Sequence, residues 1–512
     1  MSEDGELSAA GIALGSAYLT LQNIISTTIG VFGYAFMARM ITQEQMGALA
    51  GLTLIASLVQ LLSDFGLNAS TAKFVSELKG RGEDSSNYIF SAFSFRAILS
   101  LPSASILFLF SNDVSTFLFK TPTFSSAIKL IAVDSVFISF SPLLNSILWG
   151  SGMLKNMAVY GITSTAMRWL AIVFFLVKGY GLNGIVVGWI VGDFISFLML
   201  GITTSRLVKL SGSTLRNPTK NLPELLKFSW PIYASSITSF LYTWYDRALV
   251  LAYLPLTALG AYNVAYTAFS VLASLASSLG SALFPYYGMA YGRKNHNAIS
   301  LGIKKASRYT MLILFPLIVG LVVTSRPVIA LFAGQEYERG WIVLAILSSF
   351  GLVYGISPAF SNLLLIYGKT KVILFLNLFS IVVSLLFLPL VWFLSLAGLA
   401  IVRGTANLLT FLLSLYFLSK NVKIEIDYKV GLKAIFASIV MGFVVVVTQQ
   451  VAYSRFLLPL YVALGGVAYV ATIRALRVLN GEDFQLLQQL VGEKLASYAT
   501  RFLGFSEDVI KS

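Results

Sequence analysis

The chain has no cysteine, almost no histidine and few charged residues. Among its 512 residues, His296 is the single histidine, and Asp, Glu, Lys and Arg together make up 11%. Without cysteine there can be no disulfide and no thiolate nucleophile, and one histidine leaves no basis for the usual zinc sites. We therefore expect neither a cofactor nor a bound metal.

Apolar residues take the place of the missing charge. Hydrophobic residues make up 57% of the chain and the mean hydropathy is +0.81, values typical of polytopic membrane proteins. A spanning helix needs about 20 apolar residues, and on that basis we predict an all-α membrane protein with about 14 transmembrane helices. The predicted segments lie near residues 14–38, 46–72, 87–111, 124–150, 156–178, 180–205, 228–253, 258–285, 306–332, 340–366, 371–393, 396–418, 431–451 and 455–474.

The distribution of basic residues predicts the orientation of these helices. If the N-terminus is cytoplasmic, the cytoplasmic loops and the C-terminal tail hold 25 of the 36 Lys and Arg residues, and the opposite loops hold six. The positive-inside rule then places both termini in the cytoplasm. Acidic residues near the start, including Glu3, do not fit a secretory signal, so we expect the first helix to be retained. We assign the positive net charge of +14 to topology and expect no nucleic-acid partner.

The sequence repeats itself. The stretch from Ser141-Pro142 to Gly152 and Lys155 recurs at an offset of 216 residues, and Gly47 and Gly184 recur at offsets of 213 and 214. Equivalent segments are six helices apart, an even number, so we predict two parallel six-helix repeats related by an axis along the membrane normal. The prolines of the two copies, Pro142 and Pro358, predict bends at equivalent points.

The repeat predicts the domain organisation. We expect an N-lobe with six helices, a basic and proline-containing cytoplasmic linker, a C-lobe with six helices, two extra helices and a cytoplasmic amphipathic tail. Apolar residues at helical spacing from Phe484 to Phe502 favour a surface helix in that tail over a partner-binding role. The corresponding ranges are 1–206, 207–227, 228–419, 420–475 and 476–512.

No catalytic constellation is evident. Gly368-Lys369-Thr370 is similar to the end of a phosphate-binding loop, but Leu363 occupies the position of the required first glycine. The chain also offers no paired carboxylates or nucleophile and base in a catalytic arrangement. We therefore predict a protein that is not an enzyme and has no catalytic residue.

Charged residues within the predicted spans are the candidate functional residues. Each costs about 2.5–3.5 kcal/mol near a helix centre, so they should face a bundle interior or a wet cavity. The alternative is that they pair between helices to fix packing, or that Lys129 and Arg96 reach a nearby interface. The nine residues are Asp64, Arg96, Lys129, Asp134, Arg168, Asp193, Asp246, Arg247 and Arg403.

The balance of these charges suggests the ligand. Five cationic against four anionic groups suit an anionic substrate such as a phosphate or pyrophosphate. Asp134 or Asp193 could instead bind a coupling cation. Gly184, Gly188 and Gly192, spaced four residues apart, indicate a close helix–helix contact more than a gate.

Short motifs in both halves of the chain form one pattern, which runs from about residue 10 to 475. The motifs are Ala38-Arg39, Met46-Gly47, Ser63-Asp64-Phe65-Gly66-Leu67, Asp246-Arg247, Leu259-Gly260-Ala261-Tyr262, Val264-Ala265-Tyr266 and Pro285. This pattern resembles the polysaccharide and oligosaccharide flippases, the Wzx-type branch of the MATE/MOP multidrug, oligosaccharidyl-lipid and polysaccharide exporter superfamily. The extra helices 13 and 14 favour the flippase branches over drug exporters.

The resemblance implies a V-shaped pair of lobes around a central cavity and movement of a glycan on a polyprenyl or dolichyl phosphate or pyrophosphate from the cytoplasmic to the outer leaflet by alternating access. It implies a protein of the cell membrane, which we expect to be a monomer in contact with membrane lipids. We expect H⁺ or Na⁺ as a coupling ion and glycan-assembly enzymes as further partners.

Alternatives to the flippase are a cation-coupled multidrug exporter and a non-transporting scaffold of a glycan-assembly complex. The phosphate and sugar candidates are Arg96, Arg168, Arg247 and Arg403, and the counter-ion or cation candidates are Asp64, Asp134, Asp193 and Asp246.

Overall fold

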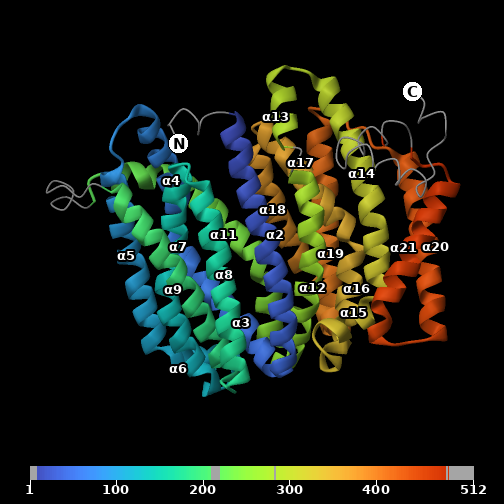
Figure 1. Ribbon diagram of the computed structural model, residues 1–512, viewed down its shortest axis with the longest axis horizontal. Coiled ribbons are helices and arrows are strands. Elements are labelled where there is room, and N and C mark those ends of the chain that lie inside the picture. Colours follow the sequence, from blue (N-terminus) through green and yellow to red (C-terminus); the bar gives the residue numbers. More distant parts are fainter. Residues whose placement is uncertain (1–8, 209–218, 282–283, 480–482, 484–512) are drawn as a thin grey trace. The chain divides into compact units, whose positions relative to one another are not determined.

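The described part of the chain is helical and divides into two units. The computed structural model describes residues 9–208, 219–281, 284–479 and 483, and these residues form helices without any strand (Figure 1). The chain separates into compact units at residues 1–260 and 261–512. The predicted lobe boundaries stay a prediction. Residues 209–218 of the predicted linker, and the tail helix from Phe484 to Phe502, lie outside the described residues.

The helices have the following bounds. The first unit contains α2 (Ala9–Met40), α3 (Gln43–Asp64), α4 (Leu67–Arg81), α5 (Ser86–Leu109), α6 (Ser111–Phe119), η1 (Pro122–Phe124), α7 (Ser125–Gly150), α8 (Leu154–Val177), α9 (Gly181–Leu207) and α11 (Leu222–Tyr253). Helix α12 (Leu256–Ser281) begins in the first unit and continues into the second. The second unit also contains α13 (Phe284–Gly292), α14 (His296–Val323), α15 (Ser325–Phe332), η2 (Gln335–Gly340), α16 (Trp341–Ser349), α17 (Gly351–Ile366), α18 (Thr370–Leu386), α19 (Pro389–Ser419), α20 (Tyr428–Val451), η3 (Arg455–Leu457) and α21 (Leu458–Ala475).

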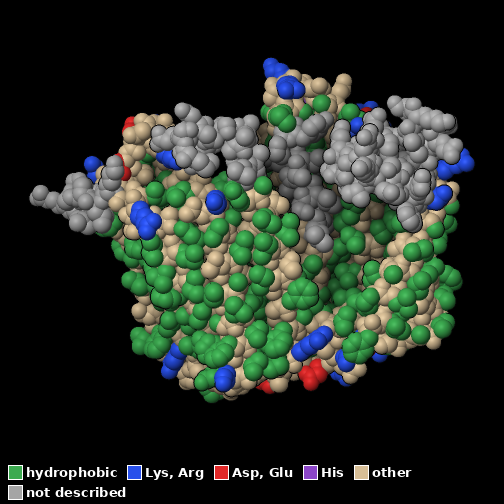
Figure 2. All heavy atoms as spheres, viewed as in Figure 1, with side chains coloured by type: hydrophobic (Ala, Val, Ile, Leu, Met, Phe, Trp, Pro, Cys, Tyr) green, Lys and Arg blue, Asp and Glu red, His purple; other side chains and the backbone are tan. Residues whose placement is uncertain are grey.

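Many of these helices are suited to a membrane. Within the described residues, ten are long and apolar enough to span a bilayer, or eleven if α16 and α17 with the preceding η2 count as one bent span. Figure 2 shows hydrophobic side chains over the flanks of the helices and Lys and Arg near the helix ends. The predicted all-α membrane protein is confirmed. The number of fourteen spans stays a prediction, because α2 and α11 are not among the ten and α18 has only 17 residues.

Helix α7 is the central helix of the first unit. It contacts α3, α4, α5, α6, α8 and α9, whereas α8 packs mainly against α9 and α2. Only 11% of the residues in the spanning window of α8 are buried, compared with 56% in the span that contains α7. Side chains on different faces of α7 therefore meet different surroundings, which matters for both sites described below.

The predicted segment 46–72 is interrupted by two left-handed residues. Helix α3 ends at Asp64, Phe65 has φ 47° and Gly66 has φ 76°, and α4 begins at Leu67. The turn is tied to α11, because the Ser229 hydroxyl donates to the Gly66 carbonyl at 3.1 Å and the Phe65 ring stacks on Tyr233 with centroids 4.5 Å apart. A Cβ atom at Gly66 would lie 2.6 Å from the Ser229 carbonyl oxygen, so close approach favours glycine here.

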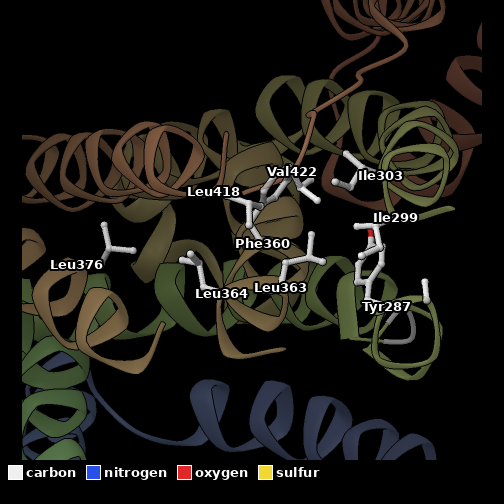
Figure 3. Close-up of a cluster of buried hydrophobic side chains, with 10 residues drawn as sticks. Tyr287, Ile299, Ile303, Phe360, Leu363, Leu364, Leu376, Leu418 and Val422 are labelled. Carbon is white, nitrogen blue, oxygen red and sulfur yellow. The ribbon is translucent and has the colours of Figure 1, made fainter. Parts of the chain in front are cut away.

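The second unit has its own apolar core. Ile299, Ile303, Phe360, Leu363 and Leu418 are buried together where α14, α17 and α19 meet (Figure 3). Helices α20 and α21 pack on each other and on α14. The two helices predicted over 431–451 and 455–474 therefore form part of the second unit.

Both copies of the repeated stretch end in the same turn. Gly152 has φ 75° and Gly368 has φ 68°, and each is the second residue after the end of its helix. In each copy the backbone N–H of the following residue, Met153 or Lys369, donates 2.9 Å to a carbonyl five residues earlier. This is a helix-ending motif that requires a left-handed residue, which explains the repeated glycine. The arrangement of the copies as parallel repeats stays a prediction.

The prolines of the two copies do not mark the break observed in the second. Pro142 lies inside the continuous helix α7, and Pro358 lies inside α17. The span in the second unit instead bends by 42° at Phe350, between α16 and α17. The Phe350 ring rests on Gly404 of α19, where any side chain would overlap it. Packing against a neighbouring helix thus accompanies this bend, which the position of proline did not predict.

Candidate functional site

A polar cavity lies inside the first unit. Its volume is about 290 Å³, and it is bounded by α3, α7, α8 and α9. Membrane-spanning helices supply all four walls, so the cavity lies in the part of the unit that the bilayer surrounds. Its lining residues are Thr53, Ala56, Ser57, Gln60, Asp134, Ile138, Ser141, Pro142, Arg168, Trp189 and Asp193.

Three of the nine predicted intramembrane charges meet in this cavity. The Arg168 guanidinium donates to the Asp193 carboxylate, and Asp134 lies close enough to Asp193 for their carboxyl groups to interact. Asp134 is 1% exposed, whereas the Arg168 side chain is 36% exposed. Arg168 is therefore the charged group of this cluster with the most room for a further partner.

Glycines on α9 determine how closely Arg168 can approach. A Cβ atom at Gly184 would lie 2.8 Å from Cβ of Phe175, and one at Gly192 would lie 2.5 Å from Cβ of Arg168. Gly188 faces Ile172 on the same side of α8. The close helix–helix contact predicted from the spacing of these glycines is confirmed, and its last step holds Arg168 against the backbone of α9 beside Asp193.

The charges of this cluster do not balance. Asp134 and Asp193 can carry two negative charges, and Arg168 supplies one positive charge. Oδ1 of Asp134 is buried and has no hydrogen-bond partner within the described residues. A buried carboxylate without a counter-charge is costly, so one bound proton or one small monovalent cation would balance the charge of this cluster.

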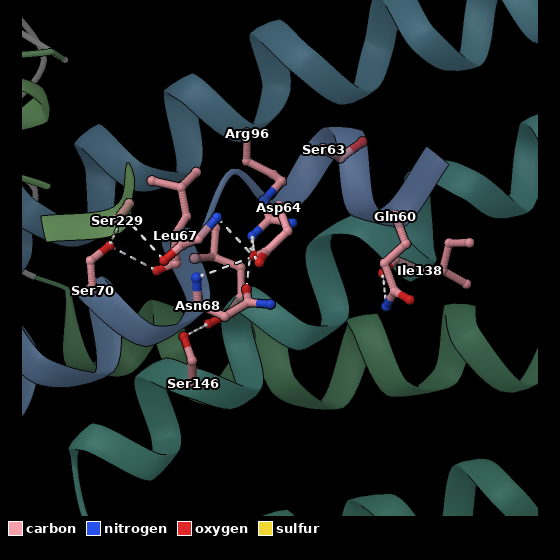
Figure 4. Close-up of polar contacts among 12 residues, drawn as sticks. Gln60, Ser63, Asp64, Leu67, Asn68, Ser70, Arg96, Ile138, Ser146 and Ser229 are labelled. Carbon is pink, nitrogen blue, oxygen red and sulfur yellow. Dashed lines mark hydrogen bonds and ion pairs between the residues drawn. The ribbon is translucent and has the colours of Figure 1, made fainter. Parts of the chain in front are cut away.

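A second pair, Asp64 and Arg96, lies outside the cavity (Figure 4). Nη2 of Arg96 donates to Asp64 and to Asn68, each at 2.8 Å, and the Arg96 side chain is fully buried. Asp64 also accepts from the backbone N–H groups of Gly66 and Asn68, both at 3.3 Å. This carboxylate thus closes the turn between α3 and α4, and the pair corresponds to the structural alternative for these charges.

Asp246, Arg247 and Arg403 have local partners. Asp246 accepts from the backbone N–H of Arg247 at 2.8 Å, and the Arg247 guanidinium lies 4.7 Å from the Trp244 ring centroid. In the second unit, Arg403 donates to the Tyr266 hydroxyl at 3.1 Å and lies over the same ring. Neither Arg247 nor Arg403 lines the cavity of the first unit.

Several cavity residues were not among the sequence candidates. Thr53, Ser57 and Gln60 share one face of α3 at helical spacing, and Trp189 lies one turn before Asp193 on α9. The spacing of the three polar residues within an apolar helix is a signal that could have been used. Within the described residues, no group of three or more His, Cys, Asp or Glu side chains could hold a metal ion.

The helices and the cavity define a multi-pass membrane protein, and its fold is that of known transporters. The chain is similar to a lipid II flippase, MurJ, in an inward closed conformation, with a TM-score of 0.73, 18% identity and coverage of 90% of this chain and 98% of the other. It is also similar to an inward-facing multidrug resistance MATE family transporter of the MOP superfamily, with a TM-score of 0.62, 17% identity and coverage of 79% and 98%.

Sequence comparison gives the family. The profile of the polysaccharide biosynthesis protein family matches residues 36–340, more than half of the chain, and the chain belongs to this family. A relative in Haloferax volcanii, named as a probable low-salt glycan biosynthesis flippase, Agl15, is 23% identical over 420 residues, which cover 81% of this chain and 85% of the relative. The predicted relation to proteins of polysaccharide biosynthesis is confirmed by this match, and the fold agrees with those of MurJ and the MATE transporter.

Proposed function

We propose that the protein is a flippase that moves an oligosaccharide linked to polyprenyl or dolichyl phosphate or pyrophosphate from the cytoplasmic to the outer leaflet by alternating access. The observation that carries the proposal is the polar cavity of the first unit, in which an accessible arginine lies among membrane-spanning helices. Family membership and the relative named as a glycan biosynthesis flippase support the cargo class. These likenesses are to transporters and support a protein that is not an enzyme.

Arg168 is the residue to which we assign the cargo phosphate. A guanidinium group binds phosphate oxygens through two parallel hydrogen bonds, and Arg168 is the one candidate arginine that lines the cavity. Arg96, fully buried against Asp64, is assigned to structure. The hydroxyl and amide groups of Ser57 and Gln60 can bind sugar hydroxyls.

Asp134 and Asp193 are assigned to ion coupling. A phosphate bound to Arg168 would compete with Asp193 for the same guanidinium. A displaced carboxylate in this setting would take up a proton or Na⁺ to remain neutral. Cargo binding and ion binding would thereby be linked through one arginine, and an H⁺ or Na⁺ gradient could supply the free energy of transport.

The proposal extends to the membrane topology, the oligomeric state and the remaining charged residues. The excess of basic residues in alternate loops supports a cell-membrane protein with both termini in the cytoplasm. We further propose a monomer that exchanges cargo with glycan-assembly enzymes. Arg247 and Arg403 are kept as secondary cargo contacts, and Asp64 and Asp246 as counter-ions.

The test is transport in liposomes. The purified full chain should move a fluorescent glycan on polyprenyl pyrophosphate between leaflets, and Arg168→Gln should slow this about tenfold or more, because a charge-assisted hydrogen bond contributes about 1.5–3 kcal/mol. Arg206→Gln, at the exposed end of α9, serves as the matched control. Unchanged transport in Arg168→Gln would refute the assignment of the site, and no transport by the unmodified chain would refute the flippase.

A multidrug exporter is the second candidate, because the carboxylates Asp134 and Asp193 line the same cavity. That function predicts efflux of small organic cations that Asp134→Asn abolishes and lipid-linked glycans do not inhibit. A non-transporting scaffold would show neither activity, and its deletion would release glycan-assembly enzymes from the membrane.

A further inference from the structure

An apolar groove lies on the outside of the first unit, between α5 and α7. Its volume is about 510 Å³. Ala104 and Ala132 are buried at its floor, whereas Phe108, Leu109 and Val133 are exposed. The small side chains form the floor of the groove and the large side chains form its walls. Helices α5 and α7 are both candidate spanning helices, and exposed residues line the groove, so it opens toward the lipid.

One cation lies at the end of this groove. Lys129 is exposed on α7, and its Nζ lies 5.8 Å from the centroid of Phe108, one of the groove residues. Lys129, Val133 and Phe137 are spaced four residues apart and so follow one face of α7. The helix rises about 12 Å from Lys129 to Phe137. The apolar strip formed by Val133 and Phe137 therefore extends about 12 Å from the charge.

We propose that this groove binds an anionic phospholipid, with one acyl chain along Val133 and Phe137 and the phosphate at Lys129. The arrangement matches an amphiphile that has a negative head and a linear apolar tail. A single lysine suits the single charge of a phosphodiester, whereas the pyrophosphate of the proposed cargo would call for more donors. The bilayer supplies phospholipid at high concentration, which favours occupancy by mass action.

The site is separate from the cavity assigned to the cargo. Asp134 and Ile138 face the cavity, whereas Val133 and Phe137 face the groove, so the two sites lie on different faces of α7. The inference therefore goes beyond the proposed function and does not depend on it. A bound phospholipid would fill the gap between α5 and α7 and stabilise the unit from its lipid-facing side.

The experiment uses the full chain in nanodiscs that contain phosphatidylglycerol with a photoreactive acyl chain. After irradiation, peptide mass spectrometry should find the label on residues 104–109 and 132–137. Lys129→Ala should reduce this labelling about fivefold, the factor that corresponds to about 1 kcal/mol for one lysine near an anionic lipid surface. Ala104→Phe, which fills the floor, should abolish it.

Matched controls decide between the outcomes. Lys120 lies 5.6 Å from the ring centroid of Phe117, which is not a groove residue, so Lys120→Ala should leave the labelling unchanged. Photoreactive phosphatidylcholine should label the groove less, without a response to Lys129→Ala. Equal labelling by both lipids, or displacement by a small amount of polyprenyl pyrophosphate, would overturn the proposal, the latter by making the groove a site for the cargo tail.

Discussion

Gly192 lies directly against Arg168, so that the backbone of α9 and the side chain of α8 occupy adjoining space. Cβ of any larger residue at position 192 would lie 2.5 Å from Cβ and 3.1 Å from Nε of Arg168. The absence of a side chain at one position thus fixes where the guanidinium meets Asp193. This relationship links a packing motif that is visible in the sequence to the proposed cargo site.

Gly192→Ala should therefore impair transport. The added methyl group must displace Arg168, and such overpacking costs about 1–3 kcal/mol. We expect glycan flipping in liposomes to fall about tenfold, with a lower melting temperature. Gly201→Ala is the matched control on the same helix, because its Cβ would lie 4.0 Å from Leu144, an ordinary contact. Equal flipping rates in the two variants would count against the role of Gly192.

Arg96→Met should destabilise the protein strongly. The change leaves Asp64 as an unpaired carboxylate beside a buried pocket, and breaking a buried ion pair costs about 3–5 kcal/mol. Thermal unfolding in detergent is the measurement. The double variant Asp64→Asn, Arg96→Met should recover much of the loss, because it removes the uncompensated charge and the asparagine oxygen can still accept from one of the two backbone N–H groups. Arg81→Ala, which breaks an exposed pair with Glu77, should change little.

Gly368→Ala tests the repeated turn. Gly368 has φ 68° and no atom within 4 Å of an added Cβ, so the cost is that of the left-handed backbone alone, about 1–2 kcal/mol. Gly368→Asn should cost less, because asparagine tolerates this conformation. Gly80→Ala also meets no atom within 4 Å but lies in a helix, and it should stabilise by about 0.5–1 kcal/mol. Chemical denaturation of the three variants gives the comparison.

Arg308→Met should loosen the end of the described chain. Arg308 donates to Asp427 at 3.2 Å, to the Val478 carbonyl at 2.9 Å and to Asp483 at 2.6 Å, so one side chain joins α14 to two later segments. Losing these charge-assisted bonds should lower the local opening free energy of residues 476–479 by about 2 kcal/mol. Amide hydrogen exchange measures this change. Exposed Lys304, mutated to Met, should leave the exchange unchanged.

Hydropathy predicted the helices well because it reports a property of each segment. It failed at Phe65 and Gly66, where two left-handed residues interrupt the predicted segment 46–72. A hydropathy average over about 20 residues cannot detect a turn of two residues. From the sequence alone, Asp64, whose side chain closes this turn, is interpreted as an isolated charge within a membrane span.

The pairing of the charges could not be predicted in the same way. Asp64 and Arg96 are 32 residues apart, and Arg168 and Asp193 are 25 apart, so each pair depends on how helices pack. Asp246 and Arg247 are neighbours in the sequence, where Asp246 accepts from the backbone N–H of Arg247 and the Arg247 guanidinium lies over Trp244. The glycine spacing on α9 was the exception, because a packing surface formed by one helix is encoded within that helix.

Helix α7 has one face on the polar cavity and another face on the lipid. Asp134 points into the cavity, and its sequence neighbour Val133 points toward lipid. A turn of this helix about its axis by one residue, about 100°, would bring the carboxylate out among hydrocarbon chains. The rotation of α7 about its own axis is thus fixed. Any change in the side of the membrane to which the cavity opens must therefore move α7 and its neighbours together as one rigid body.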